Sequence, residues 1–142
     1  GQDEVEALAQ YGSVPVINGL TDFCHPCQVL ADLMTIREYK GSLEGLKMCF
    51  IGDGNNMVNS LIVGCLKVGM EVSVACPEGY DPHPMCWPSP GRRATGSPGA
   101  GSLEAAAGVD VVFTDVWASM GQEEERAVRA AAFAAIRSTT AL

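Results

Sequence analysis

The sequence has no long hydrophobic run, no excess of positive charge and few aromatic side chains. Its apolar runs span only a handful of residues, whereas a membrane-spanning helix needs about 20. Lys and Arg number 9 against 17 Asp and Glu, which gives a net charge of −8. A chain without a basic stripe cannot displace the counterions of a phosphate backbone. We therefore expect neither a membrane nor a nucleic acid among its partners.

The composition that remains is that of a globular domain. The 142 residues are 47% hydrophobic and 18% charged, which suits one domain with a sizeable core. Of the 6 cysteines, Cys49, Cys65 and Cys76 lie inside apolar strand or helix patterns, where a free cysteine behaves as a small hydrophobic residue. We therefore expect free thiols in a reducing compartment, either the cytoplasm or an organelle matrix, such as that of a mitochondrion or plastid.

Short apolar segments alternate with helical patterns along most of the chain. Strands are expected at 14–18, 46–51, 71–76 and 109–113. Helices are expected from Pro26 to about Arg37, from Asn55 or Asn56 to about Val68, and beyond Gln122. Strands separated by helices favour parallel βαβ units. The sequence therefore predicts an α/β fold, a three-layer Rossmann-like domain with a parallel sheet, preceded by the helix that begins at Pro26.

The stretch 77–102 interrupts this alternation. It holds 6 of the 8 prolines and 5 of the 16 glycines, and such breakers do not continue a helix. A long stretch without helix or strand is typical of a functional loop or a disordered insertion. We expect a flexible loop here, without regular backbone pairing.

Polar groups gather just after the last expected strand, in the segment Asp115-Val116-Trp117-Ala118-Ser119-Met120-Gly121. Ligands of open α/β sheets bind at the carboxyl ends of the strands. A carboxylate, a hydroxyl and backbone N–H groups before a glycine suit the ammonium and carboxylate of an amino acid. The segment therefore predicts an amino-acid site, with Trp117 as a packing residue.

Two further segments bring polar side chains to helix N-termini. His25-Pro26-Cys27-Gln28 places an imidazole before a helix and an amide in its first turn, where both can reach one small polar ligand. Gly52-Asp53-Gly54-Asn55-Asn56-Met57 follows a strand but has Met57 where a dinucleotide motif needs its third glycine. Its Asn amides can donate to a carboxylate, and an N-cap fits Asn55 well.

Cys24 and Cys27 leave a different interpretation open. They form a C-x-x-C at the start of a helix, which is the placement of a thiol-redox pair. Zinc binding has less support, because the second histidine, His83, lies in the expected loop and no second C-x-x-C is present. The redox module stays a hypothesis beside the amino-acid site.

Taken in order, the His25, Gly52 and Asp115 segments resemble the ornithine carbamoyltransferases. That resemblance implies a transferase that converts carbamoyl phosphate and L-ornithine to L-citrulline and phosphate, in arginine biosynthesis or the urea cycle. It implies no metal and no organic cofactor. Full-length members of this family are commonly homotrimers, with contacts made chiefly by their carbamoyl phosphate domain.

The resemblance also implies a role for residues of the His25 segment. His25, the catalytic residue of the set, would contact the carbonyl oxygen of carbamoyl phosphate. Gln28 would contact the amino group of the same carbamoyl moiety. Both residues are therefore expected at the carbamoyl phosphate site.

The ornithine site is implied by residues of the other two segments. Asn56 would bind the α-carboxylate of ornithine, together with the backbone at Met120. Asp115 and Ser119 would hold the α-ammonium. The Ser-Met-Gly sequence favours ornithine, because relatives that carbamoylate aspartate or putrescine carry other residues in this loop.

Two functional segments of the resembling family have no counterpart here. The Ser-Thr-Arg-Thr-Arg phosphate loop has none before Gly1, and the His-Cys-Leu-Pro motif is absent after the last helical pattern. We expect an incomplete enzyme that is inactive alone and not a stable homotrimer. The expected division is a remnant of the carbamoyl phosphate domain at 1–24, an inter-domain helix and linker at 25–43, and the ornithine-binding domain at 44–142. The alternative is a non-catalytic amino-acid-binding fragment or degenerate paralogue.

Overall fold

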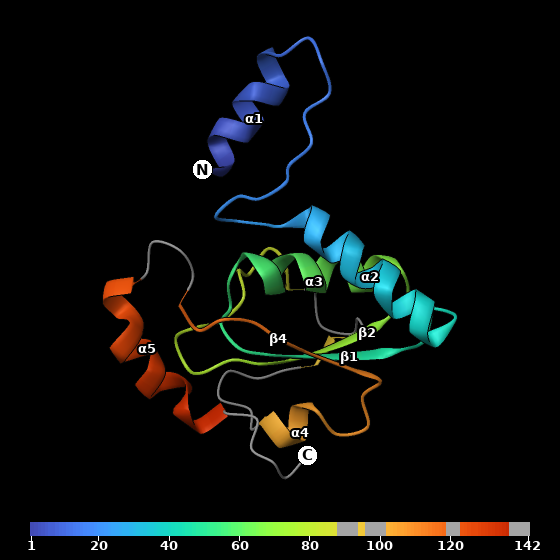
Figure 1. Ribbon diagram of the computed structural model, residues 1–142, viewed down its shortest axis with the longest axis vertical. Coiled ribbons are helices and arrows are strands. Elements are labelled where there is room, and N and C mark those ends of the chain that lie inside the picture. Colours follow the sequence, from blue (N-terminus) through green and yellow to red (C-terminus); the bar gives the residue numbers. More distant parts are fainter. Residues whose placement is uncertain (88–93, 96–101, 119–122, 137–142) are drawn as a thin grey trace.

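A parallel sheet with helices on both faces forms the centre of the computed structural model (Figure 1). The structure describes residues 1–87, 94–95, 102–118 and 123–136. The strands are β1 (Lys47–Ile51), β2 (Glu71–Ala75), β3 (Ala94–Thr95) and β4 (Val111–Thr114), in the order β3-β2-β1-β4. All pairs are parallel. The three-layer α/β fold expected from the sequence is confirmed.

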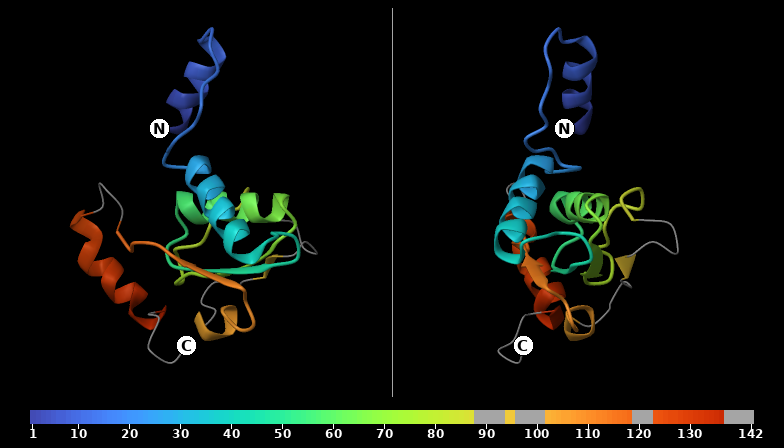
Figure 2. Two further views of the ribbon diagram at one scale, coloured as in Figure 1. Left: turned by 45° about the vertical axis from the view of Figure 1, so that its right-hand side comes forward. Right: turned by 90° about the vertical axis from the view of Figure 1, so that its right-hand side faces the viewer.

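Helices cover the sheet on two sides, and one helix lies apart from it. Those described are α1 (Gln2–Tyr11), α2 (Pro26–Lys40), α3 (Asn56–Lys67), α4 (Ser102–Ala105) and α5 (Arg126–Ala132), with single turns η1 (Glu123–Glu125) and η2 (Phe133–Ile136). In Figures 1 and 2, α2 and α3 lie over one face and α4 and α5 lie on the other. The helix α1 extends away from the sheet and buries none of its residues.

Local sequence signals fix where the two central helices begin. Pro26 occupies the first turn of α2, where its missing N–H costs no hydrogen bond. Asn55 caps α3, as expected, by accepting hydrogen bonds from the backbone N–H groups of Met57 and Val58. Glycine lets the two helices approach closely, because a Cβ on Gly64 would lie 2.5 Å from Cγ1 of Val29. The helix α3 therefore packs tightly between α2 and the sheet.

The core has two parts, one on each face of the sheet. The part below α2 and α3 is mainly aliphatic and includes Val58, Leu61, Ile62 and Val72. The part on the other face contains Ile51 and Phe133, with Tyr80 and Trp117 packed against it. Trp117 stacks on Phe133 with ring centroids 5.9 Å apart, so its expected packing role is confirmed.

Several expectations about secondary structure were wrong. Residues 14–18 form no strand; Pro15 lacks an N–H to donate, and Val14 and Ile17 are exposed. The helix α1 was not expected from the sequence, and none of its residues is buried. Within the loop expected at 77–102, Ala94 and Thr95 pair with β2, so the breakers do not prevent all regular pairing.

The helix that begins at Pro26 is longer than expected. It runs to Lys40 rather than to Arg37, and Gly41, with φ of 82°, follows it.

Among residues 1–87, 94–95, 102–118 and 123–136, no helix combines the length and hydrophobicity needed to cross a bilayer.

Candidate functional site

A cavity of about 970 Å³ lies at the carboxyl ends of β1 and β4. Parallel strands end at one edge of the sheet, so the segments that follow β1, β2 and β4 meet there. The start of α2 adds His25 and Gln28 to the lining, and α5 adds Arg129. Of the residues expected at a site, His25, Gln28, Asn56 and Asp115 all line this one cavity. Ser119 and Met120 lie outside the described residues.

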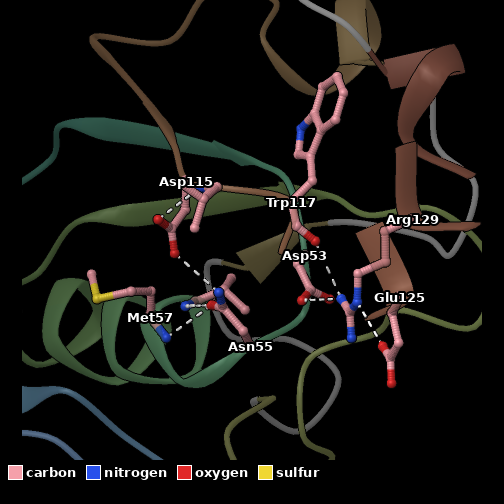
Figure 3. Close-up of polar contacts among 9 residues, drawn as sticks. Asp53, Asn55, Met57, Asp115, Trp117, Glu125 and Arg129 are labelled. Carbon is pink, nitrogen blue, oxygen red and sulfur yellow. Dashed lines mark hydrogen bonds and ion pairs between the residues drawn. The ribbon is translucent and has the colours of Figure 1, made fainter. Parts of the chain in front are cut away.

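Asp115 is held by a hydrogen bond to each of its carboxylate oxygens (Figure 3). The Nδ2 of Asn55 donates to its Oδ2 at 3.0 Å. The backbone N–H of Val116 donates to its Oδ1 at 2.8 Å. An ionised carboxylate is an acceptor with about four lone-pair sites. Asp115 therefore keeps acceptor capacity for a cationic group in the cavity.

Asn56 contacts the segment before α2 and makes no described contact with Asp115. Its Nδ2 donates to the backbone carbonyl of Thr21 at 2.7 Å. One turn further along α3, the Ser60 hydroxyl accepts the N–H of His25 at 2.8 Å and donates to the carbonyl of Asn56 at 2.9 Å. These contacts fix the start of α2 against the start of α3, and so place His25 beside the cavity.

Gln28 and His25 lie on one side of α2 with Asp32. The Nε2 of Gln28 donates to Oδ1 of Asp32 at 3.0 Å, which leaves the Oε1 of Gln28 as its acceptor. Burial raises the pKa of Asp32, while the hydrogen bond from Gln28 and the nearby His25 act to lower it. Among the described atoms, the buried Nδ1 of His25 and Oδ2 of Asp32 have no hydrogen-bond partner.

Arg129 and Asp53 form a buried ion pair at the edge of the cavity, which sequence reasoning missed. A terminal nitrogen of Arg129 lies 2.7 Å from Oδ2 of Asp53 and donates to the carbonyl of Trp117 at 3.4 Å. Its Nε donates to Glu125 at 2.8 Å, and the guanidinium lies 5.2 Å from the ring centroid of Tyr80. Figure 3 shows this guanidinium between Asp53 and Glu125. No sequence signal links Arg129 to a residue 76 positions away.

The cavity lining is rich in carboxylates. Asp22, Asp53, Asp81 and Asp115 line it, and the arginine among the described lining residues, Arg129, is already paired with Asp53. Burial raises the pKa of Asp53, and the attraction of Arg129 opposes that shift. An acidic lining attracts the cationic groups of a ligand and disfavours additional negative charge on it. The site therefore suits a ligand that carries more than one amine.

Gly54 allows the loop after β2 to approach this cavity. Its N–H donates to the carbonyl of Tyr80 at 2.9 Å. A Cβ at this position would lie 2.2 Å from the backbone carbon of Asp81, which no side chain tolerates. The glycine is required by this close approach of two backbones.

The six cysteines are free thiols. Burial raises the pKa of Cys65 and that of Cys76 to about 12, so both are unreactive thiols in the core. Cys24 and Cys27 both contact Asn18. The Nδ2 of Asn18 donates to Sγ of Cys24 at 3.2 Å, and Sγ of Cys27 donates to the backbone carbonyl of Asn18 at 3.4 Å. In the part of the chain that the structure describes, no three His, Cys, Asp or Glu side chains are grouped to hold a metal.

The fold and the cavity define a class: an α/β domain with a polar cavity at the carboxyl ends of its parallel strands. The chain belongs to the aspartate/ornithine carbamoyltransferase family. The family's Asp/Orn binding domain matches residues 44–142, and its carbamoyl-P binding domain matches residues 1–38.

Relatives and solved structures agree with this family. The ornithine carbamoyltransferase of Geobacter sulfurreducens is 53% identical over 135 residues, which are 94% of this chain and 45% of that protein. The structure of ornithine carbamoyltransferase from Pyrococcus furiosus superposes with a TM-score of 0.83 at 46% identity. The match covers 92% of this chain and 44% of the Pyrococcus chain. The structure of ornithine carbamoyltransferase from Thermus thermophilus superposes with a TM-score of 0.81 at 39% identity, and the match covers 95% of this chain and 43% of that one. The chain thus spans about 45% of the length of the curated relatives it matches.

Proposed function

We propose that this chain carries the ornithine-binding part of an ornithine carbamoyltransferase, together with the carbamoyl-contacting residues of α2. The relatives that bear this name match nearly the whole chain. The reaction proposed for the complete enzyme is attack of the δ-amine of L-ornithine on carbamoyl phosphate, which gives L-citrulline and phosphate. The proposed division keeps 1–24 with the carbamoyl phosphate domain, 25–43 as the inter-domain helix and linker, and 44–142 as the ornithine domain.

The observation that carries this proposal is the charge of the cavity. It is lined by the carboxylates of Asp22, Asp53, Asp81 and Asp115, and the arginine described there is engaged with Asp53. L-Ornithine brings two amines and one carboxylate, whereas L-aspartate brings a second carboxylate that this lining would repel. Within a family that uses either substrate, the cavity favours ornithine.

In the proposed site, each group meets the part of the substrate that its chemistry suits. Asp115 and Ser119 hold the α-ammonium, while Asn56 and the backbone at Met120 bind the α-carboxylate. His25 donates to the carbonyl oxygen of the carbamoyl group, where negative charge develops in the tetrahedral intermediate. The rate enhancement comes mainly from holding the two substrates together, and this scheme uses no metal and no organic cofactor.

Gln28 is the proposed acceptor for the carbamoyl amino group. Because its Nε2 donates to Asp32, its Oε1 is the atom left to accept a hydrogen bond from that amino group. His25 and Gln28 line the same cavity as Asp115, so the two substrates would lie side by side.

A second candidate function, binding without turnover, is favoured by the state of Arg129. Dianionic phosphate is held best by bidentate arginine contacts. In this cavity the guanidinium of Arg129 is committed to Asp53 and Glu125. We expect no measurable citrulline from the 142-residue chain alone in a colorimetric assay. Turnover at an ordinary enzymatic rate would contradict this expectation.

Chemical-shift titration of the ¹⁵N-labelled chain tests the choice of ligand. We expect L-ornithine to perturb the amides around Asp115 and Asn56 at lower concentration than L-aspartate or putrescine does. Putrescine lacks the carboxylate and the α-amino acid geometry, and the groups built for them would stay unpaired. The matched control is Asp115→Asn, which keeps the size of the side chain and removes its charge. Equal responses to the three compounds would exclude the ornithine site.

A further inference from the structure

We propose that Asn55 is the positioning residue for Asp115, a role beyond capping α3. The sequence suggests an N-cap role for Asn55, and the proposed ornithine contacts belong to its neighbour Asn56. The structure separates the two amides: Nδ2 of Asn55 donates to Asp115 and Nδ2 of Asn56 donates to Thr21. That Asp115 receives the α-ammonium rests on the proposed function, whereas the link from Asn55 to Asp115 does not.

The cap determines which end of the Asn55 amide faces the site. Its Oδ1 accepts the N–H of Met57 at 2.9 Å and the N–H of Val58 at 3.4 Å. An amide turned over would place its NH₂ group against these two donors, so the orientation with Nδ2 toward Asp115 is strongly favoured. The first turn of α3 thereby presents a hydrogen-bond donor to a residue 60 positions later in the chain.

This donor fixes the plane of the Asp115 carboxylate. Val116 donates to Oδ1 from the same backbone segment, and Asn55 donates to Oδ2 from across the cavity edge. One donor alone would leave the carboxylate free to rotate about its terminal torsion, which is a soft one. With both donors in place, the remaining lone pairs keep a constant direction for a cationic ligand. Figure 3 shows the contact between Asn55 and Asp115.

Among the residues that commonly cap helices, asparagine alone satisfies both demands at this position. Serine, threonine and aspartate cap helices about as well as asparagine does. Serine and threonine are too short for their single hydroxyl to cap α3 and also reach Asp115. Aspartate would set a second carboxylate against Asp115 and offers no donor when ionised. The capping role by itself would accept any of these residues, whereas positioning of Asp115 would not.

Asn55→Ser is the variant that separates the two roles. The cap is retained, so we expect the melting temperature to stay within about 3 °C of the parent chain. The amide of Val116, whose acceptor is no longer held from the other side, should exchange with solvent about five- to tenfold faster. The dissociation constant for L-ornithine should rise by a similar factor, because one hydrogen bond to a charged group is lost.

A double-mutant cycle with Asp115→Ala shows whether the effect passes through that carboxylate. We expect Asn55→Ser to change ornithine binding less than about twofold once Asp115 is gone. If the serine variant fails to fold, Asn55→Asp keeps a cap of similar strength and should give the same faster exchange at Val116.

The outcomes distinguish this proposal from the proposed function. Val116 exchange that is unchanged in both cap-retaining variants would overturn the positioning role, with or without a ligand. An ornithine effect of equal size in the Asp115→Ala background would overturn it as well. A parent chain that does not bind L-ornithine, but whose Val116 exchange responds to Asn55→Ser, would reject the ornithine site and retain the positioning of Asp115.

Discussion

The face of the sheet below α2 and α3 is packed mainly by aliphatic side chains, with the stacked rings of Phe50 and Phe113 among them, whereas the opposite face combines three aromatic rings with a buried ion pair. Val58, Leu61 and Ile62 of α3 are completely buried on the first face. On the second, Phe133 contacts the rings of Tyr80 and Trp117, and Arg129 joins α5 to Asp53. The two faces therefore depend on different forces for their stability.

The difference shows how each face relates to the site. The apolar core below α2 and α3 is held by non-directional burial, and α3 itself can be formed by a local pattern and a cap. The α5 side depends on directional contacts between segments that follow three different strands, and these contacts form the edge of the cavity. We therefore expect substitutions on the α5 side to affect stability and site together, and substitutions of the buried apolar residues below α2 and α3 to affect stability alone.

The largest effect is expected from Arg129→Met. It leaves the Asp53 carboxylate buried without its partner, and breaking a buried pair in this way costs about 3 to 5 kcal/mol of unfolding free energy. Urea denaturation measures the change. The double variant Asp53→Asn/Arg129→Met removes both charges and should recover most of the loss. Glu125→Gln is the control, because its side chain is 61% exposed and its pair contributes under about 1 kcal/mol. A double variant as unstable as the single one would show that packing, not charge, holds α5.

Leu61→Ala tests the aliphatic face. The side chain is fully buried, and truncation should cost about 3 kcal/mol through lost burial and a cavity. Val63→Ala on the same helix, at a position 38% exposed, should cost less than about 1 kcal/mol. Far below the melting temperature, ornithine-induced shifts in Leu61→Ala should match those of the parent chain. A weakened ornithine response there would end the distinction between the two faces.

Asp32 is a titratable residue of α2, on the side of the sheet covered by α2 and α3. Burial raises its pKa in the folded chain, so the folded state binds this proton more tightly than the unfolded state does. Its contribution to stability is therefore greatest below the unfolded value of about 3.9 and is lost as the pH rises through the raised folded value. Compared with Asp32→Asn, the parent chain should lose stability across that window. Parallel stability curves for the two proteins would contradict the shift.

The smallest effect is expected at the exposed apolar residues of α2. Leu30 and Met34 are 67% and 54% exposed, whereas Leu33 on the same helix is buried, with 6% of its surface exposed. We expect a monomer with weak concentration-dependent association, which Leu30→Gln/Met34→Gln should reduce without lowering the melting temperature. Light scattering over a dilution series measures this association. A discrete trimer that persists on dilution would show that this chain carries its own assembly surface.

Most of the α3 side could be predicted because its signals are local. The strand before Gly52, the cap at Asn55 and the buried face of α3 follow one another within a few residues, so periodicity and capping rules apply directly. The signals failed where burial was absent or the element was too short. The strand β3 has two residues, too few for a periodic pattern, and α1 lies apart from the sheet and buries none of its residues.

The sequence by itself determined the parallel α/β architecture and the segments that carry polar groups at strand ends. It did not determine how those groups pair. The pairs Asn55–Asp115 and Asp53–Arg129 join residues 60 and 76 positions apart, and their partners are set by the order β3-β2-β1-β4, which places β4 directly beside β1. A hydrophobic period records which side of an element is buried and contains no information about its neighbour. Only the tertiary structure could therefore show that Asn55 faces Asp115 and that Arg129 is occupied by Asp53.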